Sequence, residues 1–324
     1  MDPLSQATVA AIAAQCAAKP KRQKLAALAG ACGGVAPDLD VLIQSAQDPL
    51  LGLMLHRHFT HSFLFIPAGG LIVALAVWGL ARLFKKPVPF KLTAVFTTLG
   101  FATHGLLDAA TSYGTVLGWP FTSTRFAWDL IAIIDLAFTL PLLALVVLGV
   151  VYKNRGFAIA GAFYALLYLS VLAGNQYGAR QVYLTQIPPQ AAQTARVMPA
   201  LFRPFEYRAV YKHEGRIYIS TLHAPLFGDI AIKHAGSVEA VTLSDLKKQI
   251  NVTPELARAF KDYSWFSGGY VGRYGGEPLI FADYRYGNFG SPLSPLWGVR
   301  VDEGTQKASP LSLRTKIPPP EEKR

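Results

Sequence analysis

The stretch HRHFTHS at residues 56–62 contains three of the seven histidines of the chain and directly precedes a long apolar run that begins at Phe63. A short acidic turn, PDLD at residues 37–40, comes shortly before it. Imidazole and carboxylate groups are costly to hold beside hydrocarbon unless something binds them. A metal ion is the commonest such binder, since neutral imidazole and carboxylate are standard nitrogen and oxygen ligands. The two stretches therefore predict a metal site at the mouth of a hydrophobic segment.

The composition divides the chain into a membrane part and a soluble part. Hydrophobic residues make up 52% of the 324 residues and charged residues 16%, and the long apolar runs end abruptly near residue 175. Two domains are expected, because a domain takes about 150 residues. We predict a membrane-embedded helical domain over residues 1–175, an α+β domain over 176–304 and a disordered tail over 305–324.

The hydropathy pattern predicts a mainly α membrane protein with a polytopic helical bundle. Four runs are apolar and long enough to cross a bilayer, which takes about 20 residues. Two further helices are short and rich in small residues, which suits close packing inside a bundle. The predicted spans cover residues 63–84, 92–110, 130–152 and 157–174, and the short helices cover 4–18 and 25–35.

The excess of positive charge is best explained by membrane topology. The net charge is +11, and many of the lysines and arginines fall in short loops between the apolar runs. Such loops mark the cytoplasmic face of a membrane protein. Tracing the helices from there places the acidic turn, the histidine stretch and the region after residue 174 on the extracytoplasmic side. The lipid bilayer is therefore the expected partner, and no nucleic-acid partner is expected.

The soluble part shows signals of both strands and helices. Residues 206–213 and 215–223 alternate tyrosine, valine and isoleucine, and the Glu-Gly pair between them predicts a β-hairpin. Residues 242–250 and 253–263 each open with a threonine and are predicted to be helices. Further strands are expected at residues 278–286 and 296–301.

His104 and Asp108 stand four residues apart in an apolar run. A helix places them on one face, where both can reach one ion from neighbouring turns. Ionisable residues within a membrane are rare and usually face a functional interior. We predict that both bind metal; a hydrogen-bonded structural pair is the alternative.

The histidine stretch supplies two further predicted metal ligands, His56 and His61. On one helix they would lie about 140° apart. We therefore place His56 in a loop and His61 at the start of a helix, with Thr60 as the N-cap. Arg57 would hold a phosphate or one of the aspartates; a solvated surface arginine is the alternative.

Asp38 and Asp40 alternate in the acidic turn, and alternate positions of an extended turn point to the same side. One would bind metal while the other orients a histidine or takes a proton from water. A pair of N-caps for the next helix is the alternative. Arg125 and Asp135 are predicted to support the site, either as a buried ion pair or with Asp135 behind the ligands.

Four stretches resemble one known family. They are PDLD at 37–40, HRHFTHS at 56–62, HGLLDAATSYGT at 104–115 and PFTSTRFAWDLIAIID at 120–135. In order and spacing they are similar to the LexA-binding, inner-membrane-associated hydrolases, also called YdjM-like membrane-bound metal-dependent hydrolases. The resemblance implies location in the inner membrane and a distant likeness to zinc-dependent phospholipase C. It also implies a metal site formed by Asp38, Asp40, His56, His61, His104 and Asp108.

Gln6 departs from the family pattern, because related sequences carry a histidine at about this place. Glutamine is a poor zinc ligand. If that histidine binds metal elsewhere in the family, a site with several ions would here lose an ion or bind more weakly.

Together these features predict metal-assisted hydrolysis of a phosphoester, such as a phospholipid head group, with Zn²⁺ as the cofactor. Asp38 or Asp40 would act as the base, and Arg57 would hold the charge of the substrate. The alternative is a non-catalytic membrane protein with a structural or regulatory metal site and a soluble domain that binds a partner. A transporter with a proton path is less favoured, because the polar residues gather at one face of the bundle.

Overall fold

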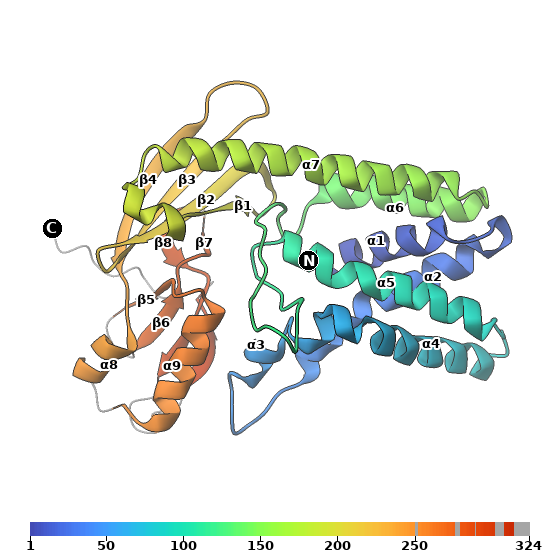
Figure 1. The fold of residues 1–324 in the computed structure, drawn as a ribbon, viewed down its shortest axis with the longest axis horizontal. Helices are drawn as coiled ribbons and strands as arrows, with labels where there is room; N and C mark the ends of the chain where they lie inside the picture. Colours follow the sequence, from blue (N-terminus) through green and yellow to red (C-terminus); the bar gives the residue numbers. More distant parts are fainter. Residues whose placement is uncertain (250–251, 276–278, 289, 302–307, 314–324) are drawn as a thin grey trace. The chain divides into compact units, whose positions relative to one another are not determined.

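The computed structural model describes residues 1–249, 252–275, 279–288, 290–301 and 308–313, and it divides the chain into two compact units (Figure 1). The first unit comprises Met1–Ile43, Leu55–Gly174 and Leu201–Pro204. The second comprises Gln44–Met54, Asn175–Ala200 and Phe205–Arg324. The long helix α7 (Gly156–Leu184) passes from the first unit into the second between Gly174 and Asn175.

The first unit is a helical bundle. Its main helices are α1 (Pro3–Cys16), α2 (Gln23–Val35), α4 (Ile66–Leu83), α5 (Phe90–Ala110), α6 (Leu136–Val151) and the first part of α7. Short helical turns connect them: η1 (Pro20–Arg22), η2 (Ala36–Leu42), η3 (Phe59–His61) and η4 (Phe63–Phe65). The side chain of Asp2 caps the start of α1, where Pro3 takes the first helical position.

Small residues let α2 and α5 approach closely. A Cβ atom added to Gly33 would overlap the carbonyl oxygen of Thr97, and one added to Gly100 would overlap the carbonyl oxygen of Gly30. Helices in membranes associate through such close backbone contact, since burial from lipid offers no hydrophobic gain. The close approach brings the end of α2 against α5, which positions the segments that carry the predicted ligands.

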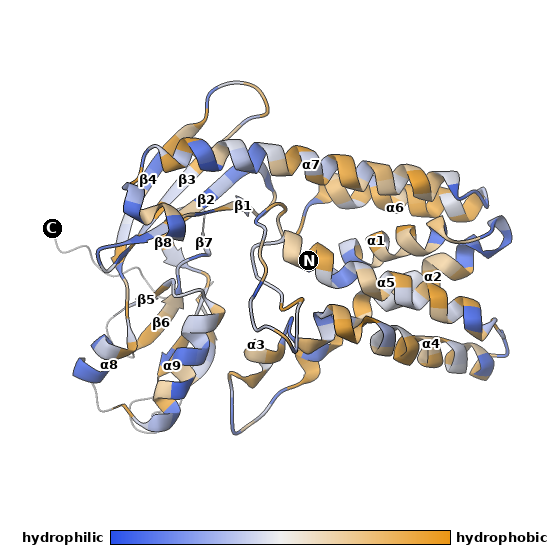
Figure 2. Cartoon of the chain, viewed as in Figure 1, coloured by the Kyte–Doolittle hydropathy of each residue, from blue (hydrophilic) through white to orange (hydrophobic). Residues whose placement is uncertain are grey.

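Three helical segments in the described residues are long and apolar enough to cross a membrane: Pro20–Leu42, Phe63–Leu83 and Gly156–Leu184. The predicted spans at 63–84 and 157–174 overlap two of them. The region predicted as a short helix at 25–35 lies in the third, because η1 and η2 extend α2 at both ends. Of the predicted span at 130–152, only residues 136–151 form a helix, the shorter apolar helix α6 of 16 residues, and α5 is not among the candidates. The count of four spans is therefore not confirmed, although Figure 2 shows the apolar character of α4, α6 and the first part of α7.

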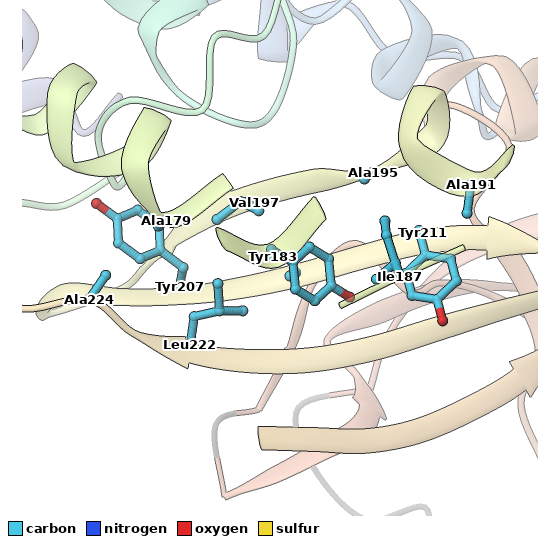
Figure 3. Packing of buried hydrophobic residues seen from close by; sticks show 11 residues of the cluster. Ala179, Tyr183, Ile187, Ala191, Ala195, Val197, Tyr207, Tyr211, Leu222 and Ala224 are labelled. Carbon is cyan, nitrogen blue, oxygen red and sulfur yellow. The ribbon is translucent and has the colours of Figure 1, made fainter. Parts of the chain in front are cut away.

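The second unit is rich in β-structure. Its first sheet has the strand order β1-β2-β3-β4, formed by β1 (Arg196–Ala200), β2 (Arg203–His213), β3 (Arg216–His223) and β4 (Ala231–Glu239). The predicted hairpin is confirmed, with β2 and β3 antiparallel and Glu214 and Gly215 at positive φ in the turn. The end of α7 and η5 (Pro189–Thr194) pack their side chains against one face, where Tyr183, Tyr207 and Leu222 meet (Figure 3).

A second sheet, β10-β9-β6-β5, contributes to a core on the other side of the first. Its strands are β5 (Val271–Arg273), β6 (Ile280–Asp283), β9 (Trp297–Val301) and β10 (Ala308–Ser312), and β7 (Gly287–Asn288) pairs with β8 (Ser291–Pro295). The predicted helices are α8 (Leu243–Gln249) and α9 (Pro254–Phe266), and Thr253 caps α9 as expected. Parts of the predicted elements and of the predicted tail lie outside the described residues, namely 250, 278, 305–307 and 314–324. The prediction of a disordered tail from residue 305 is wrong for β10, which pairs with β9.

Candidate metal centre

Three segments of the first unit bring four predicted ligands together. Asp38 comes from η2, His61 ends η3, and His104 and Asp108 lie on the last turns of α5. One ligand atom from each residue lies within 4.8 Å of every other. The side chain of Asp38 is 24% exposed, whereas the other three are fully buried. These four residues, called the HD cluster below, are contributed by positions as far apart as 38 and 108.

The four histidine-to-aspartate distances within the HD cluster match the edges of a metal tetrahedron. His61 Nε2 lies 3.5 Å from Asp38 Oδ1 and 3.3 Å from Asp108 Oδ2. His104 Nε2 lies 3.3 Å and 3.5 Å from the same two oxygens, and 2.9 Å from His61 Nε2. Ligands about 2.0–2.2 Å from a tetrahedral Zn²⁺ are separated by about 3.3–3.6 Å. Four of these five separations fall in that range.

The donor atoms are also chemically suited to a cation. Asp38 Oδ1 and Asp108 Oδ2 are buried and accept no hydrogen bond. His104 Nδ1 donates to the carbonyl oxygen of Gly34, a bond that leaves the Nε2 lone pair directed into the cluster. Two imidazole nitrogens and two carboxylate oxygens form a set that zinc accepts. The residues present therefore fit a divalent ion.

His61 shows how strongly the cluster favours positive charge. Burial alone disfavours the charged imidazolium, but the carboxylates of Asp108, Asp38 and Asp40, which lie 3.3–3.5 Å from its ring nitrogens, outweigh this and raise the pKa of His61 to about 10. Carboxylates thus surround the imidazole from several sides, and a divalent cation would satisfy the same charges.

Asp40 and His56 lie beside the HD cluster and not within it. His56 Nδ1 is 2.7 Å from Asp40 Oδ1, and the His56 ring meets the His61 ring edge-on with centroids 6.0 Å apart. Asp40 Oδ2 accepts hydrogen bonds from the Arg57 backbone N–H at 3.1 Å and the Thr60 hydroxyl at 2.8 Å. The same oxygen is 3.4 Å from His61 Nδ1. Asp40 thus ties the histidine stretch together behind His61.

The local backbone differs from three predictions, one of which placed His61 at the start of a helix, whereas it ends η3. Asp38 and Asp40 do not sit in an extended turn, because the 3₁₀ helix η2 continues directly from α2 with Pro37 near its start. A 3₁₀ helix has three residues per turn, so side chains two positions apart point in different directions. Asp38 and Asp40 therefore reach different partners. Thr60 is not an N-cap; it lies inside η3, and its hydroxyl lies 3.0 Å from His61 Nδ1. His56 occupies a turn, as predicted.

Arg57 is buried against the HD cluster. Its φ of 62° is unusual for a residue with a side chain, and hydrogen bonds from the Val116 N–H to its carbonyl and from its own N–H to Asp40 hold this conformation. Arg57 Nε lies 3.0 Å from Asp108 Oδ2, and Nη1 donates to Thr111. The guanidinium also lies over the ring of Tyr113. These contacts position Asp108 and exclude the solvated-arginine alternative.

Gln6 and Met1 also reach the cluster, and neither is among the predicted metal ligands. Gln6 Nε2 donates to Asp108 Oδ1 at 2.8 Å, and the α-ammonium of Met1 pairs with the same oxygen. The other oxygen, Asp108 Oδ2, therefore faces His61 and His104. The signal in the sequence was the group of polar side chains near the start of α1, where Ser5, Gln6 and Thr8 stand among apolar residues. The carbonyl of Gly34 offered no signal, because any residue carries one.

Arg125 and Asp135 have different hydrogen-bond partners. Asp135 caps α6 through the Phe138 N–H, and both of its oxygens accept from the Tyr168 hydroxyl, at 2.9 and 3.1 Å. Arg125 donates to the carbonyl of Gly114. The structure thus shows Asp135 as a helix cap that links α6 to α7, and no described contact joins it to the HD cluster.

Asp40→Asn tests the support that Asp40 gives to His61. The amide turns one acceptor oxygen into a donor, which faces either His56 Nδ1 or the Arg57 N–H and Thr60 hydroxyl together, so the histidine stretch loses a fixed partner. Metal affinity should fall about 10- to 100-fold, as is common when a group behind a histidine ligand is lost, while bound metal remains detectable at saturation. Competition with a chromogenic chelator measures this, and unchanged affinity would exclude the supporting role.

Comparison with known protein families identifies a match over the first part of the chain. The family described as YdjM inner membrane protein matches residues 1–178, a range that includes the whole HD cluster and the histidine stretch. Comparison with curated proteins and with solved structures gives no match.

Proposed function

This chain belongs to the YdjM inner membrane protein family, and we propose that it is a metal-dependent hydrolase acting on a phosphoester at the membrane surface. The observation that carries the proposal is the set of separations between the HD cluster atoms, four of which lie at 3.3–3.5 Å. This is the spacing of donors around a single Zn²⁺. Apolar helices together with the family assignment make the chain a membrane protein.

The ion would supply Lewis acidity, which polarises a phosphoryl oxygen and lowers the pKa of water from about 15.7 toward about 7. Among the four donors Asp38 is the exposed one, at 24%. Its carboxylate is therefore the best placed to release one position to water and to accept a proton. Asp40 is fully buried, and its hydrogen bonds are used within the histidine stretch. We assign the base role to Asp38 and a positioning role to Asp40.

Apolar side chains beside Asp38 favour a substrate that arrives in the membrane. Leu39 and Leu42 in η2 are 62% and 76% exposed, and Val41 is 46% exposed. These side chains face outward from the same short helix whose aspartates face the cluster. An exposed apolar surface next to a metal site suits the lipid phase, so a phospholipid head group is the preferred phosphoester. The clustering of lysine and arginine in other loops supports an extracytoplasmic location for the site.

Purified protein reconstituted in phospholipid vesicles provides the test. Elemental analysis should find one zinc ion per chain, and hydrolysis of a chromogenic phosphodiester or of the phospholipid should stop with a chelator and return with added Zn²⁺. Hydrolysis that continues in metal-free protein would overturn the proposal. Hydrolysis by Asp38→Asn at the rate of the parent protein would exclude the role of Asp38 as the base.

A structural or regulatory metal site is the second candidate. It is favoured by the presence of four protein donors, since structural zinc sites are closed by four ligands whereas catalytic sites keep an open position. The ion pair between Arg57 and Asp108 also occupies space beside the cluster. This candidate predicts stoichiometric zinc and a lower unfolding temperature after chelation, without turnover of any phosphoester.

A further inference from the structure

We propose that the loop between β3 and β4 inserts Leu226 and Phe227 into the surface of the membrane that α7 crosses. The occupant of this apolar surface is the lipid bilayer, at the boundary between head groups and acyl chains. The β-rich unit would then hold the membrane at a second point, separate from the helix that enters it. The inference is independent of the metal site.

The two side chains are exposed to an unusual degree. Phe227 is 92% exposed and Leu226 is 48% exposed, and they are adjacent at the tip of the loop. An aromatic ring and a leucine left in water together are unfavourable, and transfer into an apolar phase relieves this.

The loop lies where α7 leaves its apolar stretch. Residues 156–174 of α7 carry no charged or amide side chain, and Asn175 and Gln176 follow directly. Nineteen helical residues span about 28 Å, close to the thickness of the hydrocarbon core. The Asn175 side chain donates to the carbonyl of Ala224 at 3.0 Å, and Tyr207 donates to Asn175. Ala224 is two residues from Leu226, so this hydrogen bond holds the apolar tip of the loop close to the end of the apolar stretch of α7.

The opposite end of the sheet has the opposite character. The turn between β2 and β3 contains Glu214, whose side chain is 80% exposed, and Lys212 and Arg216 flank it. This turn lies about 23 Å from the end of β3 that leads into the loop, since a strand rises about 3.3 Å per residue. The charged β2–β3 turn lies far from the helix boundary, whereas the apolar tip of the β3–β4 loop lies next to that boundary. This is the distribution of polar and apolar residues expected of a unit that rests on a bilayer.

The test places an environment-sensitive fluorophore at each end of the sheet. Cys16 and Cys32 are replaced by alanine, and Phe227→Cys or Glu214→Cys supplies a single labelling site on the full chain. Both proteins are reconstituted in vesicles of phosphatidylcholine and phosphatidylglycerol, with or without bromine on the acyl chains. The label at position 227 should be blue-shifted and quenched at least about twofold by brominated lipid, because it lies among acyl chains. The label at position 214 should show neither effect.

Equal quenching at the two positions, or none at position 227, would overturn the proposal. A label at position 227 that is shielded from water without quenching by bromine would also overturn it, since a second copy of the chain or another protein would then cover the loop. Phe227→Trp in the same vesicles repeats the measurement with a side chain of native type. A tryptophan there that brominated lipid leaves unquenched would contradict the insertion independently of the label.

Discussion

Replacing His104 by alanine should remove the bound metal ion, and replacing His61 should do the same, whereas His56→Ala should retain it. His61 and His104 each present Nε2 to the HD cluster, and loss of either leaves buried carboxylates with an incomplete set of partners. His56 pairs with Asp40 outside the cluster. We expect metal content to fall from one ion per chain to a trace in the first two variants, together with any hydrolysis. Elemental analysis of the purified proteins measures this.

His58→Ala is the matched control, because this histidine comes from the same stretch and its ring faces Phe59 and Trp119. It should bind metal as the parent does. Full zinc occupancy in both His61→Ala and His104→Ala would refute the HD cluster as the metal site. Loss of metal in His56→Ala with folding intact would instead extend the ligand set to His56.

Gly105→Ala should disrupt the site without touching a ligand. A Cβ atom at this position would overlap the carbonyl oxygen of His61, which is backbone and has little freedom to move. The single added methyl group therefore pushes η3 away from α5, and His61 away from His104. We expect metal affinity to fall at least about tenfold, because ligand positions tolerate only small displacements. Chelator competition and circular dichroism together separate loss of the site from loss of the fold.

Gly79→Ala is the control for Gly105→Ala. Gly79 lies in α4, and an added Cβ there would have no atom within 4 Å. Alanine in place of glycine should leave metal affinity unchanged and stabilise the helix by up to about 1 kcal/mol. If Gly105→Ala binds metal as tightly as Gly79→Ala, the close contact between α5 and the histidine stretch does not control the site.

Helical periodicity and membrane chemistry were sufficient to predict much of the arrangement. The spacing of His104 and Asp108 placed both on one face of α5, and the hairpin around Glu214 was evident from its alternating strands. The family assignment was predicted from four short motifs and is confirmed over residues 1–178. These features depend on local sequence, where periodicity carries the information.

The sequence could not distinguish the residues inside the cluster from those beside it. Asp38 and Asp40 differ in role because η2 is a 3₁₀ helix, and its tighter turn sends them to different partners. Asp135 follows Arg125 closely in sequence, yet its partner is Tyr168, which lies 33 residues further along the chain. Partners that meet through packing leave no periodic trace in the sequence.

The scatter of the ligands along the chain, from residue 38 to residue 108, has a consequence for biogenesis. An ion held by η2, η3 and α5 can be captured once the third of these segments has left the ribosome and entered the bilayer. The proposed ion could then be captured before α6 and α7 are inserted. If the proposed ion joins these segments, chains made without it would have a loosely joined bundle, and membrane proteases would encounter such chains first.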